Sequence, residues 1–112
     1  MNGEVKNSRR FPRIRSERSI RVSRLDPEGL MGLSSTRVLG LGGCMFFHPE
    51  SLGAGTLVGL EIDAGQGGTV VTTARVVYEF FRGSDGYEVG VEFLDLGPRE
   101  SGLLQRLLAS GG

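Results

Sequence analysis

Apolar and polar side chains alternate along most of this chain, which is the pattern of β-strands with one buried face. The stretches that break the alternation are rich in Gly, Pro, Asp and Ser, as turns are. One of them, Asp26-Pro27-Glu28-Gly29, separates the first two apolar stretches. The pattern predicts six strands, over Ile14–Val22, Gly32–Leu39, Cys44–Phe47, Thr56–Ile62, Val70–Phe80 and Tyr87–Phe93.

The later strands indicate most clearly which side chains face inward. In the fourth, the residues expected to share one side are Thr56, Val58, Leu60 and Ile62. In the fifth, they are Val70, Thr72, Ala74, Val76, Tyr78 and Phe80. In the sixth, apolar residues alternate with Glu88 and Glu92, so we expect these two glutamates to share a face turned to solvent.

Only the last segment changes its period. Pro98 suits the first turn of a helix, and leucines follow at helical spacing. We predict a helix over 98–109, and the leucines expected to pack on the strands are Leu103, Leu104, Leu107 and Leu108. Short strands with close turns and one terminal helix favour a small antiparallel barrel, because closing a sheet removes its exposed edges.

The composition restricts the class of protein. The chain has 112 residues, 38% of them hydrophobic, which is enough for the core of one domain. A single cysteine and a single histidine exclude an internal disulfide, a multi-cysteine zinc site and a metal site with two histidines. Since no apolar stretch approaches the roughly 18 residues of a membrane helix, we expect a cytoplasmic protein without membrane insertion.

The net charge is zero, but the charges are unevenly distributed. Residues 1–24 contain eight basic and two acidic residues, whereas residues 25–112 contain five basic and eleven acidic ones. A basic arm before an acidic body indicates that the arm meets an anion, or that it neutralises its own domain. The acidic body and the absence of tryptophan argue against nucleic acid as the partner.

The most informative part of the arm is Arg9-Arg10-Phe11-Pro12-Arg13. Pro12 disfavours a continuous helix, so we expect an extended segment. Arginine binds phosphates through paired hydrogen bonds, contacts guanine O6 and N7, and stacks on bases. The alternative interpretation is a basic tail in solvent.

A glycine-rich turn, Gly40-Leu41-Gly42-Gly43, follows the second predicted strand. Its glycines allow close approach of the backbone to a ligand, or a sharp bend at a barrel corner, which we favour for Gly42. Nearby, we expect Cys44 to be a buried structural thiol and His48 a turn residue. No nucleophile, base and orienting group are in register, so we do not predict an enzyme.

In their order and spacing, these features resemble the PilZ domain family, whose members are bacterial receptors for cyclic di-GMP. Arg9 to Arg13 is similar to the family's R-x-x-x-R motif, including the proline before its last arginine. Gly86 to Phe93 is similar to the family's last strand. The resemblance extends from Arg9 to Leu108 and implies an all-β fold, a six-stranded antiparallel PilZ-type β-barrel with a C-terminal α-helix.

The resemblance also implies how the chain is organised. A flexible N-terminal tail (1–8) precedes a single PilZ domain over 9–109. Within that domain we expect an arginine arm (9–15), a barrel (16–97) and the helix (98–109).

The family's second motif, [D/N]-x-S-x-x-G, is degenerate in this chain. With Gly43 as its last residue, Val38 occupies the Asp/Asn position and Gly40 the Ser position. In the family these polar residues help to hold a guanine, which neither Val38 nor Gly40 can do through its side chain. Two missing polar contacts should cost about 2–4 kcal/mol, or roughly thirty- to several-hundred-fold in affinity.

The function implied by the resemblance is that of a signalling module. It binds cyclic di-GMP through the arginine motif and relays binding by ordering the arm, with no cofactor or metal. The residues implied for the ligand are Arg9, Arg10, Arg13, Gly40 and Gly43. The alternative is a degenerate PilZ domain that binds no nucleotide and acts as an adaptor for a protein partner.

Overall fold

The computed structural model describes residues 13–111 of the chain. Within this range the chain forms strands, two short 3-10 turns and a C-terminal helix. The elements are β1 (Arg13–Arg15), β2 (Ser19–Leu25), β3 (Glu28–Gly40), β4 (Gly43–His48), β5 (Leu57–Asp63), η1 (Gly65–Gly67), β6 (Thr69–Phe81), η2 (Gly83–Asp85), β7 (Tyr87–Phe93) and α2 (Pro98–Ala109).

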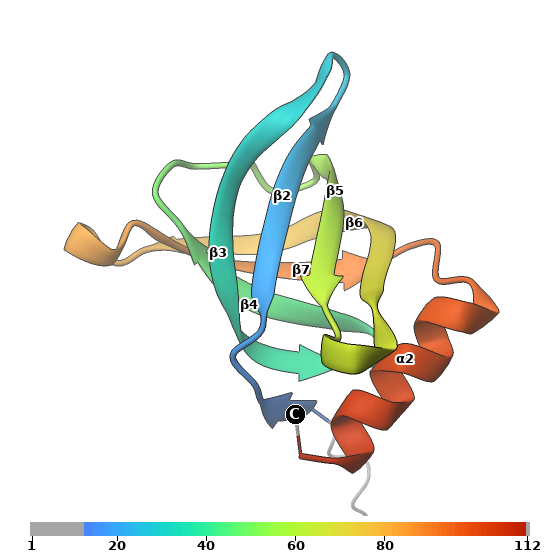
Figure 1. Ribbon diagram of the computed structural model, residues 1–112. Helices are drawn as coiled ribbons and strands as arrows, with labels where there is room; N and C mark the ends of the chain where they lie inside the picture. Colours follow the sequence, from blue (N-terminus) through green and yellow to red (C-terminus); the bar gives the residue numbers. More distant parts are fainter. Residues whose placement is uncertain (1–12, 112) are drawn as a thin grey trace, which may run out of the picture.

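Six of the strands form a closed antiparallel barrel (Figure 1). Around the barrel the order is β3, β2, β5, β6, β7 and β4, and a pairing between β3 and β4 closes it. The short strand β1 is added to the end of β3. The predicted six-stranded antiparallel barrel with a C-terminal helix is therefore confirmed.

The prediction of one strand over Ile14–Val22 is wrong, because the chain leaves the ladder between β1 and β2. Buried Thr36 of β3 holds the link between these strands. Its hydroxyl donates to the carbonyl oxygen of Ser16 at 2.6 Å and accepts from the N–H of Arg18 at 2.9 Å. The register between β3 and β4 shifts just after Thr36, at Arg37, so the break coincides with a bulge.

A second bulge, in β6, explains why part of the predicted inner face of this strand is wrong. Its register against β7 shifts at Val77, and beyond this residue Tyr78 pairs with Gly90 on the outer side of β7. One extra residue reverses the face of the side chains that follow it. Tyr78 and Phe80 therefore lie on the outer face, and Phe80 is 51% exposed, contrary to the prediction that both line the interior.

Helix α2 covers one end of the barrel (Figure 1). The predicted leucine face is confirmed, since Leu103, Leu104 and Leu107 belong to the buried core and Leu108 packs against it. Burying a leucine contributes about 1.5–3 kcal/mol relative to its exposure, so the helix stabilises the barrel. Among residues 13–111, no helix is long and apolar enough to cross a membrane.

Three further predictions concern single residues. Thr56 does not face inward with β5, because the strand begins only at the next residue and Thr56 is exposed.

His48 is not a turn residue, because it is the last residue of β4 and is only 1% exposed. Its Nδ1 lies 2.9 Å from the carbonyl oxygen of Glu50. Cys44 is a buried free thiol, as predicted, and burial raises its pKa to about 12.

Candidate ligand-binding site

The structure places the last arginine of the arm beside the glycine-rich turn. In the antiparallel pair of β1 and β3, Arg13 lies directly opposite Gly40. The chain then bends at Leu41 and Gly42, and Gly43 begins β4. Three of the predicted site residues thus meet at one corner of the barrel. Arg9, Arg10 and the predicted tail (1–8) lie outside the described residues.

This corner faces outward from the barrel. Leu39, which precedes Gly40, is fully buried and pairs with Ile14 of β1. Because successive strand residues point to opposite faces, Gly40 and Arg13 belong to the outer face. Arg13 is accordingly exposed and available to a ligand on the barrel surface.

Arg15 is a candidate ligand residue that the motif search missed. It lies opposite Val38, at the degenerate motif position, and it is exposed. Opposed residues of an antiparallel pair share a face, with Cβ atoms roughly 4.5–5.5 Å apart. Arg15 and Arg13 are two residues apart, a spacing that places both side chains on one side of a strand. This two-residue spacing is the signal from which Arg15 could have been identified in the sequence.

Glycines leave part of this outer face without side chains. Gly43 pairs with Glu92 of β7, and a Cβ on Gly43 would lie 2.1 Å from the carbonyl oxygen of Val91. Only glycine therefore permits this approach of β4 to β7. Gly40 also lacks a side chain and is buried, so neither glycine adds a side chain to the face between Arg13 and Glu92.

A neighbouring row on the outer face is apolar. Val38 pairs with Met45, and Met45 pairs with Gly90. The ring of Tyr78 covers Gly90, because a Cβ there would lie only 2.0 Å from Tyr78 Cε2. The row from Arg15 through Val38 and Met45 to Tyr78 thus begins with a cation and ends with an aromatic ring.

Charges from both sides of this face act on Tyr78. Burial, and then the Glu88 carboxylate, raise the pKa of Tyr78 above its ordinary value, while the positive charges of Arg13 and Arg82 oppose the rise. The phenol is therefore protonated at neutral pH, and its hydroxyl donates to Glu88 at 3.2 Å. Arg13 therefore acts electrostatically on the phenol of Tyr78.

A comparison of the sequence with models of protein families shows which family this chain belongs to. The sequence model of the PilZ domain matches residues 7–110, which include the arm, the barrel and the helix. The chain belongs to the PilZ domain family. In this PilZ domain Arg13, the predicted last arginine of the R-x-x-x-R motif, lies opposite Gly40, the predicted Ser position of the second motif.

Solved structures share the fold of this PilZ domain. The PilZ domain of YcgR from Escherichia coli with cyclic di-GMP superposes with a TM-score of 0.69 at 20% identity, over 94% of this chain and 92% of that chain. YcgR from Escherichia coli in complex with cyclic di-GMP gives 0.75 at 23% identity, over 93% of this chain and 46% of that chain. The Bacillus subtilis inhibitor of motility gives 0.74 at 16% identity, over 93% and 51%.

The present chain thus spans about half the length of the latter two proteins. No curated protein matches it significantly in sequence.

The glutamates next to this part of the PilZ domain are partnered by arginines. Glu88 and Glu92 share the outer face of β7, as predicted. Arg82 lies 2.9 Å from Glu88, and Arg75 donates to Glu92 through Nε at 2.7 Å. These pairings offset the negative charge that would otherwise repel an anion near Arg13.

Within the described part of the chain, no cluster of three or more His, Cys, Asp or Glu could hold a metal ion.

Proposed function

We propose that this PilZ domain is a receptor module for cyclic di-GMP, which it binds on the outer face beside β1, β3 and β4. The observation that carries the proposal is the register of β1 on β3, with Arg13 opposite Gly40 and Arg15 opposite Val38. Two exposed arginines therefore lie on one face of β1, opposite Gly40 and Val38. Arginines of this kind bind phosphate through paired hydrogen bonds.

Within this proposal, Arg15 replaces a contact that the degenerate motif has lost. Val38 cannot hydrogen-bond a guanine, but the guanidinium of Arg15 starts from the opposing strand on the same face. Arginine donates to O6 and N7 of guanine, whereas a carboxylate accepts from the N–H groups of a base. The ligand is thus held by a different edge of the guanine, and part of the affinity expected to be lost is retained.

The remaining contacts follow from the shape and chemistry of the face. Arg13 binds a phosphate, together with Arg9 and Arg10 of the arm. The backbone at Gly40 and Gly43 allows close approach of the ligand. In the proposed relay, the ligand holds the arm against the barrel, and this ordering is the output that a partner reads.

Calorimetric titration with cyclic di-GMP tests the proposal. We expect saturable binding by the wild type at ligand concentrations below about 100 μM. Arg13→Ala and Arg15→Ala should each weaken binding by about ten- to a hundredfold, because each removes a charge-assisted contact. Arg24→Ala is the matched control, since this exposed arginine lies on the β2–β3 hairpin.

Two results would contradict the proposal. Absence of heat for the folded wild type up to about 100 μM ligand would exclude a receptor of useful affinity. Equal affinity of Arg15→Ala and Arg24→Ala would remove Arg15 from the site and leave the loss at Val38 uncompensated.

The adaptor function is the second candidate, and an exposed aromatic pair favours it. Phe80 and Phe81 are 51% and 67% exposed near the end of the β6–β7 hairpin, which extends away from the barrel (Figure 1). Exposed aromatic residues of this kind occur at protein interfaces. An adaptor would capture its partner equally well as wild type and as Arg9→Ala/Arg13→Ala, with no heat in the nucleotide titration.

A further inference from the structure

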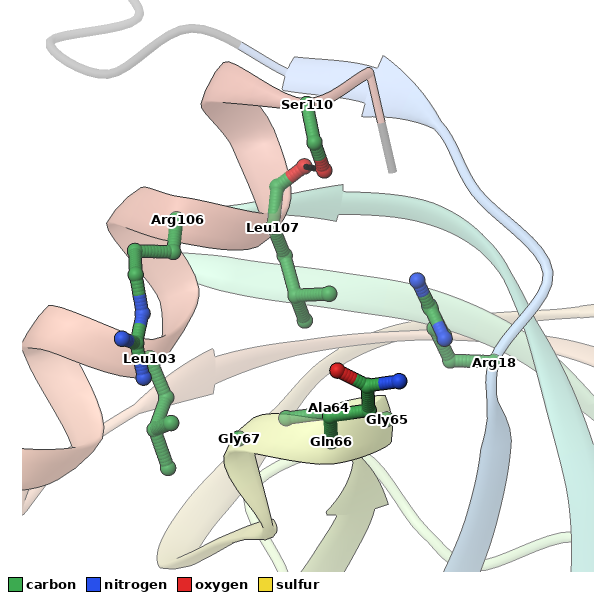
Figure 2. Close-up of a pocket in the computed structure, with 9 residues that line it drawn as sticks. All are labelled: Arg18, Ala64, Gly65, Gln66, Gly67, Leu103, Arg106, Leu107 and Ser110. Atoms are coloured by element: carbon green, nitrogen blue, oxygen red, sulfur yellow. Dashed lines mark hydrogen bonds between the residues drawn. The ribbon is translucent and has the colours of Figure 1, made fainter.

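A groove lies between α2 and the η1 turn, at the end of the barrel that the helix covers (Figure 2). Its volume of about 530 Å³ is within the range of small-ligand pockets. Its lining comes from the link before β2, from the η1 turn with its N-cap, and from about the last two turns of the helix with its C-cap. The lining residues are Arg18, Ala64, Gly65, Gln66, Gly67, Leu103, Arg106, Leu107 and Ser110.

Arg106 is the central charged residue of this groove. Its guanidinium lies against the η1 turn, since a Cβ on Gly67 would be 3.2 Å from Arg106 Nη2. Arg106 is exposed, and it makes no ion pair or hydrogen bond through its side chain to any residue that the structure describes. Its hydrogen-bond donors are therefore available to a ligand in the groove.

Two more arginines lie close to the same turn. Arg18 is on the opposite wall of the groove, with Nη1 3.6 Å from the position of a Cβ on Gly65 (Figure 2). Arg18 also takes part in another interaction, so Arg106 carries the inference. Arg99 lies two helical turns before Arg106, and its Nη2 would be 2.8 Å from a Cβ on Gly68. Three guanidinium groups therefore surround one glycine-rich turn.

The charge of this region contrasts with that of the rest of the body. Residues 25–112 carry five basic and eleven acidic residues, and yet Arg99 and Arg106 of α2 both lie next to this turn. Two carboxylates lie nearby, and one of them is paired with an arginine of this cluster. Asp63 accepts from the N–H of Gly65 at 2.9 Å, and Glu100 lies 3.2 Å from Arg99.

We propose that this groove is an anion-binding site for a phosphorylated small molecule. Arg106 binds the phosphate from the helix side, and Gln66 of the η1 turn adds a neutral polar contact. Leu103 and Leu107 form an apolar wall for the part of the ligand that carries no charge. Its lining residues differ from those of the proposed cyclic di-GMP site at β1 and β3, so the two sites can be tested separately.

Pyrophosphate is the probe that tests the site. In heteronuclear NMR titration of the full chain, we expect saturable shifts of the Gln66 and Gly67 amide signals below about 10 mM pyrophosphate. Arg106→Ala should raise the dissociation constant about tenfold or more, because a charged donor is lost. Arg106→Lys should bind with intermediate strength, since it keeps the charge but lacks the paired donors of arginine.

The controls separate this site from others. Arg24→Ala removes one exposed charge on the β2–β3 hairpin and should leave pyrophosphate binding within about twofold of the wild type. Unsaturable shifts, or equal affinity of Arg106→Ala and wild type, would overturn the assignment. Succinate binding as tightly as pyrophosphate would overturn the preference for phosphate over a carboxylate.

Discussion

Individual glycines determine how closely the backbones of this barrel approach one another. Gly43 is the clearest case, because the atom that a Cβ would meet is a backbone oxygen of β7 and cannot rotate away. Gly102 of α2 is the opposite case, since a Cβ there would meet nothing within 4 Å. The two positions therefore distinguish a glycine required by packing from one that only adds backbone freedom.

We expect Gly43→Ala to lower the free energy of unfolding by about 1–3 kcal/mol or more, because β4 must move away from β7. Gly102→Ala, the matched control, should raise it by about 0.5–1 kcal/mol, because alanine favours the helix more than glycine does. Urea unfolding followed by circular dichroism measures both. Similar effects of the two substitutions would mean that the close approach of the strands does not require Gly43.

At the scale of elements, one side chain of β6 holds the loop between β4 and β5. The carboxylate of Glu79 accepts from the Ser51 hydroxyl at 2.7 Å and from the backbone N–H groups of Leu52 and Gly53, at 2.5 and 3.1 Å. Burial alone would raise the pKa of Glu79, but these hydrogen bonds outweigh it and the pKa is lowered. The loop is thus attached to the hairpin through an ionised group.

Glu79→Gln should lower the free energy of unfolding at pH 7 by about 1–3 kcal/mol, because the charged acceptor is lost. Since the folded-state pKa of Glu79 is below its ordinary value of 4.5, the contribution is fully present above pH 4.5. It is lost as the pH falls through the lowered value. Urea unfolding from pH 7 to 3 should therefore show the wild type and the variant converging in acid, and a constant difference would contradict this.

Most of the elements could be predicted from sequence because their signals are local, but the division of the predicted first strand into β1 and β2 could not. Alternating positions identified the barrel strands, and the leucine spacing identified α2. The bulges at Arg37 and Val77 could not be predicted, because they depend on the register of a neighbouring strand. For the same reason the motifs indicated Arg13 and Gly40, but the position of Arg15 opposite Val38 emerged only from the pairing of β1 with β3.

At the scale of the whole molecule, the barrel and α2 share one hydrophobic core. Leu104 is fully buried and belongs to the same cluster as residues of β5, β6 and β7. A helix that supplies part of a common core should not unfold separately from the strands. We therefore expect one cooperative unfolding transition for residues of the barrel and the helix.

Leu104→Ala should lower the free energy of unfolding by about 2–5 kcal/mol, because it leaves a cavity between the helix and the strands. Hydrogen exchange should show the core amides of α2 and β6 losing protection by equal amounts. If only the helix amides lost protection, α2 would be a separately unfolding attachment. Leu108→Ala, at a partly buried position on the same helix, should have a smaller effect.

The three residue pairs that join β1 to β3 also act as a tether. A chain spans at most about 3.6 Å per residue, so Arg10 and Arg9 can lie no farther than about 11 Å and about 14 Å from Arg13. In the proposed function, a nucleotide bound beside Gly40 would therefore meet these arginines at a high effective concentration, as an intramolecular event. The folding of β1 would then meet part of the entropic cost of bringing the cations to the ligand, and the ligand would meet the rest when it orders the arm.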